Sequence, residues 1–505
     1  MNRIQKIAPQ GQPFDPVRAA MNWVPSRGAR LYAGALLTAA FGGLVFRAFS
    51  AEVGAAILAL IGAACYGLLL ATLWRDAKQG DLLRLLVPAL LVGLALGAHF
   101  SLFSISPGRM KSVLIPLSDT LWNYDLRIAM AWEEGSWSGG YLIVMALLSR
   151  LETFSLLYAV KLIDLVCLTA AAIAVHRLAR LRGAGAGARA VALVGALLLP
   201  TMLLNAGLWA QCDAVFAAFS LWGLAMLLQE KPWRGMALWG IALAMKLQSA
   251  FLFPLLLFWF MRRKVGMRHL LALLAAFLLL HLPMLLEGQS LPSVLGRYEA
   301  QRVMVAYGAP SDEEEAQEEE PQEAMEETLA EGETDQAEAP EEQPTHEGLA
   351  SHAPSVYSLM SIASVREFSG MGRYLGYATA LLIVFAMIRS RRALDADAQL
   401  SAAMILCCAL PLILPQANPR FLYLAGLLSL TRLRGALRIL EAALLELVSF
   451  CSVLEAIFST DALLASVLPM TVLSLLAILV ACMVAWELFC ACTDRDLWGN
   501  AHDVG

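Results

Sequence analysis

Charged residues are scarce in this chain. They make up 16% of its 505 residues, whereas soluble domains carry about 25%. Hydrophobic residues make up 59%, and many apolar runs approach the ~20 residues that a helix needs to cross a bilayer. The composition therefore excludes an ordinary soluble protein. It predicts an all-α polytopic membrane protein with about 12–14 transmembrane or re-entrant helices.

Several motifs of common chemistry are also absent. The nine cysteines form no CxxC pair, and their spacing indicates neither a zinc site nor a disulfide framework. HExxH, P-loop, GxSxG and GxGxxG patterns are missing as well, which argues against the metalloprotease, nucleotidase, hydrolase and dehydrogenase chemistries that they support. The sequence offers no convincing set of metal ligands, and no cofactor is assigned to it.

The start of the chain lacks the apolar core of a cleavable signal peptide. Residues 1–28 are polar and contain four basic residues. We therefore expect a cytoplasmic N-terminal segment over 1–28. The first apolar run, near 31–48, should then be a retained signal-anchor helix.

Lysine and arginine are missing from residues 312–347, which hold 17 of the 42 acidic residues. The rest of the chain has 25 acidic and 37 basic residues, so the formal net charge of −5 hides an excess of +12 outside this stretch. A block of like charge cannot bury a core, so we expect a disordered acidic tract over 311–348. Loose binding of divalent cations is an alternative to the plainer interpretation that the tract is only solvated.

Basic residues recur at one end of the apolar segments. This is the positive-inside pattern of a multi-pass protein of the cell membrane, with both termini in the cytoplasm, and not a nucleic-acid patch. The predicted parts are a membrane core over 29–286 with an outer loop at 105–140, an outer loop at 287–372, C-terminal membrane helices over 373–490 and a cytoplasmic tail at 491–505. The predicted apolar segments lie near 29–48, 53–73, 83–104, 154–175, 190–204, 210–228, 235–247, 248–261, 268–286, 374–388, 398–415, 420–432, 437–458 and 463–490.

The stretch 235–261 has basic residues at both ends, so both ends should lie on the same side of the membrane. It must cross twice as short helices, or enter and return. Non-helical backbone at membrane depth is tolerated only where it lines protein or a water-filled cavity. Lys246 lies at the predicted turn.

Two polar clusters interrupt these apolar runs. Gln211 and Asp213 lie in one, and Lys246 and Gln248 lie in the other. An ionisable group costs ~2.5–3.5 kcal/mol at the centre of a membrane helix, so it normally faces a partner, a cavity or a substrate path. One interpretation is a structural ion pair between Asp213 and Lys246. The other is that Lys246 helps to bind an anionic group such as phosphate.

The predicted outer side carries four further candidates. Asp119 and Asp125 lie among aromatic residues, and residues 120–134 suit an amphipathic helix at the interface. Either carboxylate can serve as a general base, or both simply face solvent. Arg420, in an outward turn, offers a fixed fork for phosphate or reaches toward headgroups. His352, after the acidic tract, is a further ligand or base candidate, although a lone loop histidine is more often neither.

At these motifs the chain resembles bacterial membrane glycosyltransferases of the GT-C superfamily that are similar to the second GPI-anchor mannosyltransferase. Members show an outer-loop Asp, a W-x-Q-x-D motif, a K-x-Q motif, an Asn-Ala-Pro-Ser-like motif and a late Leu-Pro-x-Met-His-Glu-Arg-Tyr motif. The matching residues here are Asp119 (with Asp125 as the fallback), Trp209, Gln211, Asp213, Lys246, Gln248, the stretch 351–355 with His352, and the stretch 414–421 with Arg420. The resemblance covers roughly residues 83–435, and the spacing of the second and third motifs is its most specific part.

The chain departs from the family pattern at two places. Gly139, Gly140 and Tyr141 stand where the family has a Pro-rich entry to the next helix. Asn418 and Pro419 stand where it has His-Glu, so no role of that pair is carried over to this chain.

The resemblance implies a GT-C-like fold and a reaction. A polyprenyl-phosphate-linked, mannose-like hexose binds with its lipid between helices, and Lys246 or Arg420 meets its phosphate. Asp119 deprotonates the hydroxyl of a lipid, glycan or protein acceptor, which attacks the anomeric carbon with inversion. Some GT-C enzymes use a divalent metal, so metal dependence stays open.

Two other functions remain alternatives. A transporter or lipid flippase also has broken helices and charges at the membrane midplane, although this sequence shows no internal repeat between its halves. A non-catalytic GT-C-like membrane protein is the second alternative, because the His-Glu pair is lost. Membrane lipids are partners under every interpretation.

Overall fold

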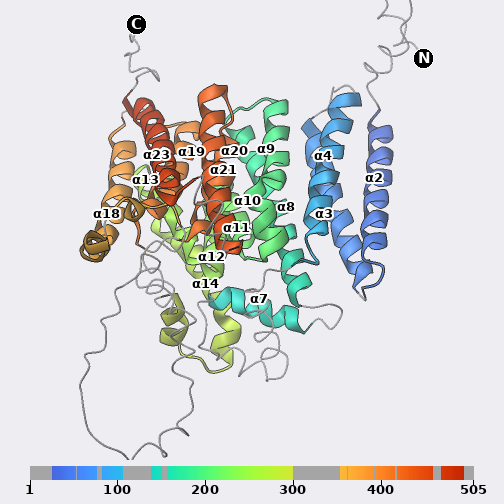
Figure 1. Cartoon of the computed structure of the whole chain (residues 1–505), viewed down its shortest axis with the longest axis horizontal. Coiled ribbons are helices and arrows are strands. Elements are labelled where there is room, and N and C mark those ends of the chain that lie inside the picture. The colour runs from blue at the N-terminus through green and yellow to red at the C-terminus, as the bar shows by residue number, and fades with distance from the viewer. Residues whose placement is uncertain are drawn as a thin grey trace, which may run out of the picture.

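The computed structural model of this chain describes residues 26–52, 54–76, 82–105, 138–150, 156–298, 353–360, 362–390, 393–415, 418–458 and 468–493. Every regular element within these ranges is a helix (Figure 1). Asp119, Asp125 and His352 lie outside the described residues, as do the predicted interfacial helix 120–134 and the acidic tract 311–348.

The helices follow the predicted apolar segments closely. Their bounds are α2 (Arg27–Ala48), α3 (Ala55–Asp76), α4 (Leu82–Ser101), α7 (Gly139–Ser149), α8 (Leu156–Leu181), α9 (Ala186–Leu198), α10 (Pro200–Met202), η1 (Leu203–Trp209), α11 (Asp213–Leu228), α12 (Pro232–Met245), η2 (Leu247–Leu252), α13 (Pro254–Met261), α14 (Met267–Leu286), η4 (Val356–Leu359), α18 (Ile362–Arg389), α19 (Ala396–Ile413), η5 (Pro419–Leu422), α20 (Tyr423–Thr431), α21 (Gly435–Phe458) and α23 (Met470–Thr493). A further helical segment spans residues 291–298.

Seven of these helices are long and apolar enough to cross a membrane, by length and composition. They are α2, α3, α8, α14, α18, α19 and α23. An eighth span is obtained if α9 and the segment Pro200–Trp209, which meet at a bend of 41°, count as one. The predicted all-helical, polytopic membrane fold is therefore confirmed at this level.

Two helices differ from the predicted segments. α7 is apolar but has only 11 residues, too few to stand out as a span, and it has no counterpart among the predicted segments. α18 begins at Ile362, inside the stretch 287–372 that the hydropathy pattern assigned to an outer loop. Its first turns contain Arg366 and Glu367, which made them resemble loop.

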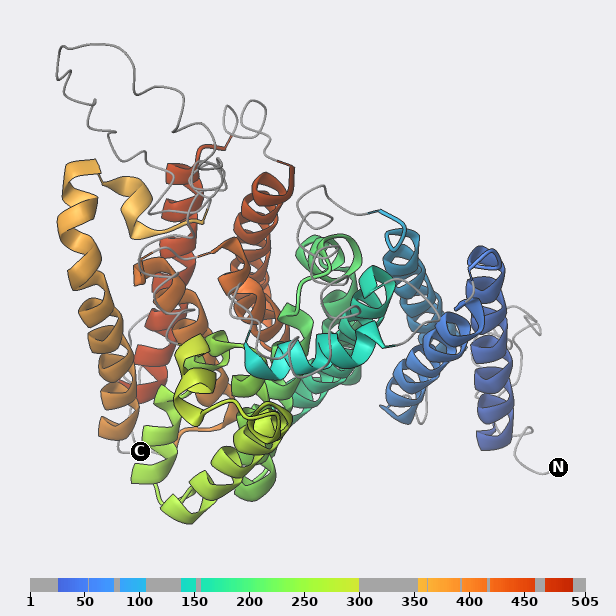
Figure 2. The same ribbon diagram turned by 90° about the horizontal axis from the view of Figure 1, so that it is seen from below.

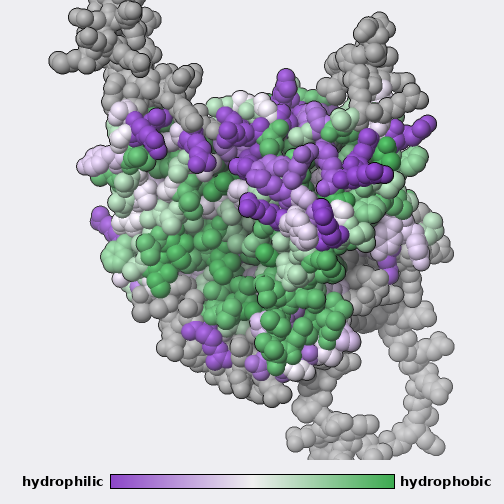
Figure 3. All heavy atoms as spheres, turned by 180° about the vertical axis from the view of Figure 1, so that it is seen from behind, coloured by the Kyte–Doolittle hydropathy of each residue, from purple (hydrophilic) through white to green (hydrophobic). Residues whose placement is uncertain are grey.

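The basic helix ends meet at one end of the bundle. Lys264 Nζ lies 3.3 Å from Glu230 Oε1, so the hairpin of α12 and α13 has both its ends there, as the charge pattern predicted. Asp397, just inside α19, lies 3.4 Å from Arg182 Nε of the α8–α9 turn and 2.9 Å from an Arg438 nitrogen of α21. Hydrophilic side chains gather along this end, and a wide hydrophobic surface lies next to them (Figure 3).

A buried ionic network ties α20, α21 and α23 together at this end. Arg432 is 1% exposed, bonds to Glu487 and lies 3.3 Å from Glu441. Arg438 donates to the other oxygen of Glu487 at 2.9 Å. Removing one member of such a network leaves a buried charge without its partner, which is costly.

Glycines bring the central helices close together. A Cβ on Gly223 of α11 would collide with the ring of Trp239 on α12, and that ring donates from Nε1 to Ser220 O at 3.0 Å. Small residues at such points let membrane helices approach backbone to backbone. This packing fixes α11 against α12, the two helices whose ends carry Asp213 and Lys246.

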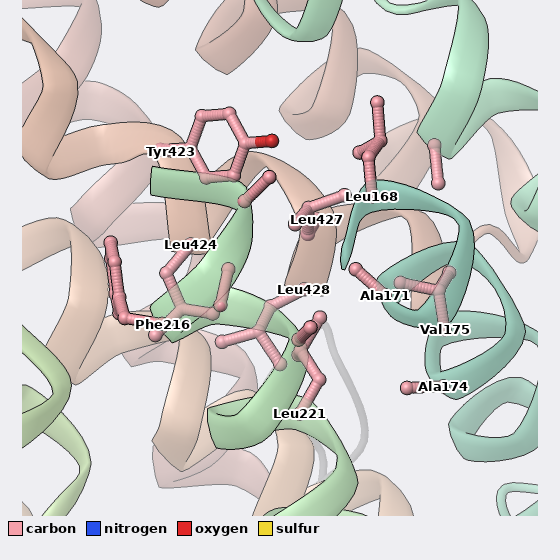
Figure 4. Close-up of a cluster of buried hydrophobic side chains, with 14 of the residues drawn as sticks. Leu168, Ala171, Ala174, Val175, Phe216, Leu221, Tyr423, Leu424, Leu427 and Leu428 are labelled. Carbon is pink, nitrogen blue, oxygen red and sulfur yellow. The ribbon is translucent and has the colours of Figure 1, made fainter. Parts of the chain in front are cut away.

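The bundle core lies between α8, α11 and α20. Leu168 and Val175 of α8 face Leu221 of α11 and Leu427 of α20 in a cluster of buried hydrophobic side chains (Figure 4). Helices α2 to α4 stand to one side of this core and contact it through α8, α9 and η1 (Figure 2). The site described next lies at one edge of the core.

Candidate functional site

The first helix break follows α9 and places Gln211 and Asp213 in the interior of the bundle. Pro200 starts a new turn after α9, as proline can at a first helical position. The next turns form the π-helix η1, a form that is rare and frequent at functional sites. η1 ends at Trp209, and the next residue, Ala210, has a φ of 55° and a ψ of 45° in the left-handed region, where a side chain is strained. Gln211 and Asp213 follow, 6% and 0% exposed.

The second break lies at Lys246. α12 ends one residue earlier, Lys246 is extended with φ −164° and ψ 135°, and the tight helix η2 follows. Pro254 then starts α13. The change of direction turns the Lys246 side chain out of its helix and toward α11.

Groups from outside α12 satisfy carbonyls at its end. The Tyr298 hydroxyl donates to Ala244 O at 2.8 Å, and the Ser138 hydroxyl donates to Met245 O. His281 Nε2 lies 3.1 Å from the Tyr298 hydroxyl. Gly140 lies against the same place, since a Cβ there would come within 2.6 Å of Ala244 O. These contacts hold the turn that carries Lys246.

Lys246 and Asp213 form an ion pair between the two breaks. The Asp213 side chain is 1% exposed and that of Lys246 is 11% exposed. Asn205 of η1 donates from Nδ2 to the second Asp213 oxygen at 2.7 Å. The Lys246 ammonium also lies 5.6 Å from the centre of the Phe216 ring, within range of a cation–π contact. The predicted structural ion pair therefore exists in this geometry.

Arg420 comes from a third region of the chain and joins the same cluster. It donates to Gln211 Oε1 and, from Nε, to Asn418 Oδ1 at 2.9 Å. Its guanidinium carbon lies 5.1 Å from the centre of the Trp209 ring. All of these partners are neutral, and none of the described acidic residues forms an ion pair with Arg420. Within the described part of the chain, its positive charge is therefore held in place without a paired carboxylate.

The cluster lies at the helix ends opposite the basic ends. Asp213 begins α11, whose other end leads to Glu230. Tyr423, three residues after Arg420, begins α20, whose other end leads to Arg432. Lys246 likewise follows the end of α12 remote from Lys231. If the basic ends face the cytoplasm, as predicted, the cluster faces the outer side.

Asn418 has a clear local role. Its side-chain oxygen accepts hydrogen bonds from the backbone N–H of Arg420 at 3.1 Å and from Arg420 Nε. Asn418 therefore both caps η5 and orients the Arg420 guanidinium. Pro419 begins η5. Asn418 and Pro419 thus position Arg420.

The remaining predicted site residues are not all brought together. Gln248 lies in η2, and its Oε1 has no hydrogen-bond partner among the described residues. Asp119, Asp125 and His352 belong to the undescribed stretches, so their predicted roles remain predictions. The stretch that carries Asp119 and Asp125 ends at Ser138, which is bonded beside Lys246.

Sequence reasoning missed four residues around the ion pair: Asp164, Asn205, Tyr423 and Lys161. Lys161 Nζ donates to Leu102 O at 2.8 Å and to Phe103 O at 3.1 Å, so it caps the end of α4. The available signal was two ionisable residues, Lys161 and Asp164, three positions apart in one apolar segment. Such residues are functional candidates by default.

The described residues contain no group of three or more His, Cys, Asp or Glu side chains that could hold a metal ion. The described residues of the cluster instead offer a guanidinium without a paired carboxylate among them, an ammonium held by a carboxylate, and amide groups. This chemistry suits an anionic group with hydrogen-bonding neighbours, such as a phosphate ester. Comparison with protein-family models and with curated proteins gave no match to the chain.

Proposed function

We propose that this protein is a membrane glycosyltransferase that moves a mannose-like hexose from a polyprenyl-phosphate carrier to an acceptor hydroxyl on the extracytoplasmic side. One observation carries the proposal. Gln211, Asp213, Lys246 and Arg420 come from three motifs, with Gln211 and Arg420 209 residues apart, and they meet at helix breaks. The same motifs carry the resemblance to the GT-C mannosyltransferases.

Arg420 is the better candidate for the carrier phosphate. Its described partners are neutral, and they hold the guanidinium in a fixed orientation. An arginine fork can bond two phosphate oxygens at once. Lys246 is already paired with Asp213, so its role is to add positive potential beside the phosphate.

The acceptor is activated, in this proposal, by Asp119, with Asp125 as the fallback base. The stretch that contains both ends at Ser138, one residue before α7, and Ser138 is bonded to the turn that carries Lys246. That tether joins the loop of the predicted base to the turn of the predicted phosphate site. A carboxylate takes the proton of the attacking hydroxyl, and the phosphate leaves with the electron pair of the broken glycosidic bond.

The test is sugar transfer by purified protein in lipid vesicles. Synthetic polyprenyl-phosphate mannose is offered with membrane-extract acceptors, and products are followed by mass spectrometry. We expect transfer by wild type, and a loss of at least about a hundredfold in Asp119→Asn, in line with the ~10²–10⁴-fold contribution of a general base. Arg434→Gln, which removes an exposed arginine at the opposite end, should leave transfer unchanged. If wild type binds carrier but no donor sugar is ever transferred, the proposal is wrong.

A lipid flippase is the second candidate, and a specific observation favours it. Two helix breaks place Asp213 and Lys246 inside an apolar bundle, and many transporters also carry charges at broken helices. A vesicle assay with a fluorescent polyprenyl-phosphate analogue separates the two functions. Movement between leaflets without sugar transfer supports the flippase, whereas transfer without movement supports the enzyme.

A further inference from the structure

A glutamate in the middle of α21 is bonded to the first helix break. Glu446 Oε1 accepts hydrogen bonds from the backbone N–H and from the hydroxyl of Thr201, both at 2.8 Å. Thr201 is 1% exposed and lies 245 residues away in the chain. Among the described residues, Glu446 forms no ion pair. A carboxylate inside an apolar membrane bundle is costly, so it is a functional candidate by default.

The two bonds complete the hydrogen bonding of the break. Pro200 has no N–H group, and the two N–H groups that follow Thr201 bond to Leu199 O, at 2.9 and 3.1 Å. The N–H group of Thr201 itself bonds to Glu446 instead. N–H groups in a first helical turn need such partners, and a carboxylate also suits the positive end of a helix. Glu446 therefore caps, from another helix, the chain that restarts at Pro200.

A single turn of η1 connects this cap with the candidate site. Asn205 lies about one turn after Thr201. Its side chain donates from Nδ2 to Asp213 at 2.7 Å, and its carbonyl accepts from the N–H of Gln211 at 3.3 Å. Gln211 in turn accepts a hydrogen bond from Arg420. The orientation of η1 therefore determines where Asp213 and Gln211 lie.

α21 packs against the elements on both sides of this contact. It packs on α10 and η1 at the first break and on η5, which carries Arg420, and it lies beside α10 in Figure 1. Through Glu446, α21 is bonded to the break as well as packed on it. The carboxylate therefore holds η1 in place relative to the helix against which η5 also packs.

We propose that Glu446 is a positioning residue for the carrier-phosphate site. By binding Thr201, it keeps η1 in the orientation in which Gln211 bonds to Arg420. Its described hydrogen bonds both go to Thr201, so it acts through η1 and not on the substrate. Its effect on carrier binding rests on the proposed function, whereas its effect on the orientation of η1 does not.

The orientation of η1 is measured by ¹⁹F NMR of the full chain, labelled with 5-fluorotryptophan, in nanodiscs. Trp209 ends η1, and its ring centre lies 5.1 Å from the guanidinium carbon of Arg420, so its signal reports on this contact. Trp239, which packs between α11 and α12, is the internal reference. Each signal is assigned with its Trp→Phe variant. We expect Glu446→Ala to shift the Trp209 signal and to leave the Trp239 signal unchanged.

The affinity for polyprenyl phosphate is measured on the same samples. We expect the Kd to rise about tenfold in Glu446→Ala and by less in Glu446→Gln, whose amide oxygen still accepts a hydrogen bond. Thr201→Ser keeps both donors and should behave as wild type. Glu455→Gln neutralises a carboxylate further along α21 and should change neither the Trp209 signal nor the Kd.

An unchanged Trp209 signal in folded Glu446→Ala would overturn the proposal. Equal shifts of the Trp209 and Trp239 signals would overturn it as well, because they would show a general loss of packing. If Glu446→Ala does not fold, Glu446→Gln decides, and wild-type values of both the Trp209 signal and the Kd would count against a positioning role. A Trp209 shift in a protein whose wild type binds no carrier would contradict the proposed function and leave the role of Glu446 at η1 intact.

Discussion

The Lys246 ammonium donates to the Asp213 carboxylate across 33 residues of sequence, and each partner stands at a break in an apolar helix. α11 begins at Asp213, and α12 ends at Met245, one residue before Lys246. The ion pair therefore marks the point where the bundle departs from regular structure.

Neutralising one partner of this pair should destabilise the protein more than neutralising both. Asp213→Asn or Lys246→Met alone leaves a buried charge without its partner, at a cost of about 3–5 kcal/mol. The double variant removes both charges and should lose less than the sum of the single changes. Unfolding midpoints in detergent measure this difference. Additive losses would contradict a direct pairing.

Arg420 should matter more than Lys246 for the carrier phosphate. Arg420→Lys keeps the charge but loses the fork and the contact with Trp209, so we expect carrier affinity to fall by about tenfold, or ~1.4 kcal/mol. In Arg420→Gln, the affinity for the carrier should fall further. Binding of polyprenyl phosphate, compared with the unphosphorylated polyprenol, measures the phosphate contribution. The matched control is Arg434→Gln, an exposed arginine at the other end of the bundle. Equal loss of polyprenol binding would show that Arg420 only supports the fold.

The contacts that hold the Lys246 turn should be separable from the fold as a whole. Tyr298→Phe removes the donor to Ala244 O, and Ser138→Ala removes the donor to Met245 O. Each change leaves a carbonyl unsatisfied, which costs about 1–3 kcal/mol. Hydrogen exchange should rise over η2 while α9, which packs on α8, α4 and α20, stays protected. Uniform loss of protection across all helices would argue against a local role.

The close contact between α11 and α12 should not tolerate a methyl group. Gly223→Ala places a Cβ within 2.2 Å of a carbon of the Trp239 ring, and overpacking of this kind costs about 1–3 kcal/mol. Gly43→Ala in α2 is the matched change, because nothing lies within 4 Å of its Cβ position. The midpoint temperature of thermal unfolding should therefore fall for Gly223→Ala and stay unchanged for Gly43→Ala. A neutral Gly223→Ala would show that the two helices are packed more loosely than described.

Much of the fold could be predicted from the sequence, because the residues that make a segment a membrane span lie next to one another in the chain. A run of apolar residues with basic residues at one end predicts both the helix and its direction, and the bounds of α14 and α21 differ from the predicted segments by at most a couple of residues. α7 was not predicted because an 11-residue helix is too short to give the hydropathy signal of a membrane span. The early start of α18 was not predicted because its first turns contain polar residues.

The site was only partly accessible to the same reasoning. Asp213 and Lys246 stood out as charges in apolar runs, and their pairing was one of two open interpretations. Nothing local showed that Gln211 would meet Arg420, because their contact depends on the packing of η5 against the first break. Asp164 and Tyr423 were missed for a similar reason, since only tertiary packing leaves their oxygen atoms buried and unpartnered.

The most direct test of the central claim is a time course of sugar transfer from synthetic polyprenyl-phosphate mannose by the reconstituted wild type and by Arg420→Gln. Folding and carrier binding are checked on the same samples. The account predicts a mannosylated product from wild type, with transfer at least about tenfold slower in Arg420→Gln at low donor concentration and partly restored at high donor concentration. No product from folded, carrier-binding wild type would contradict the account, and so would a rate that Arg420→Gln leaves unchanged.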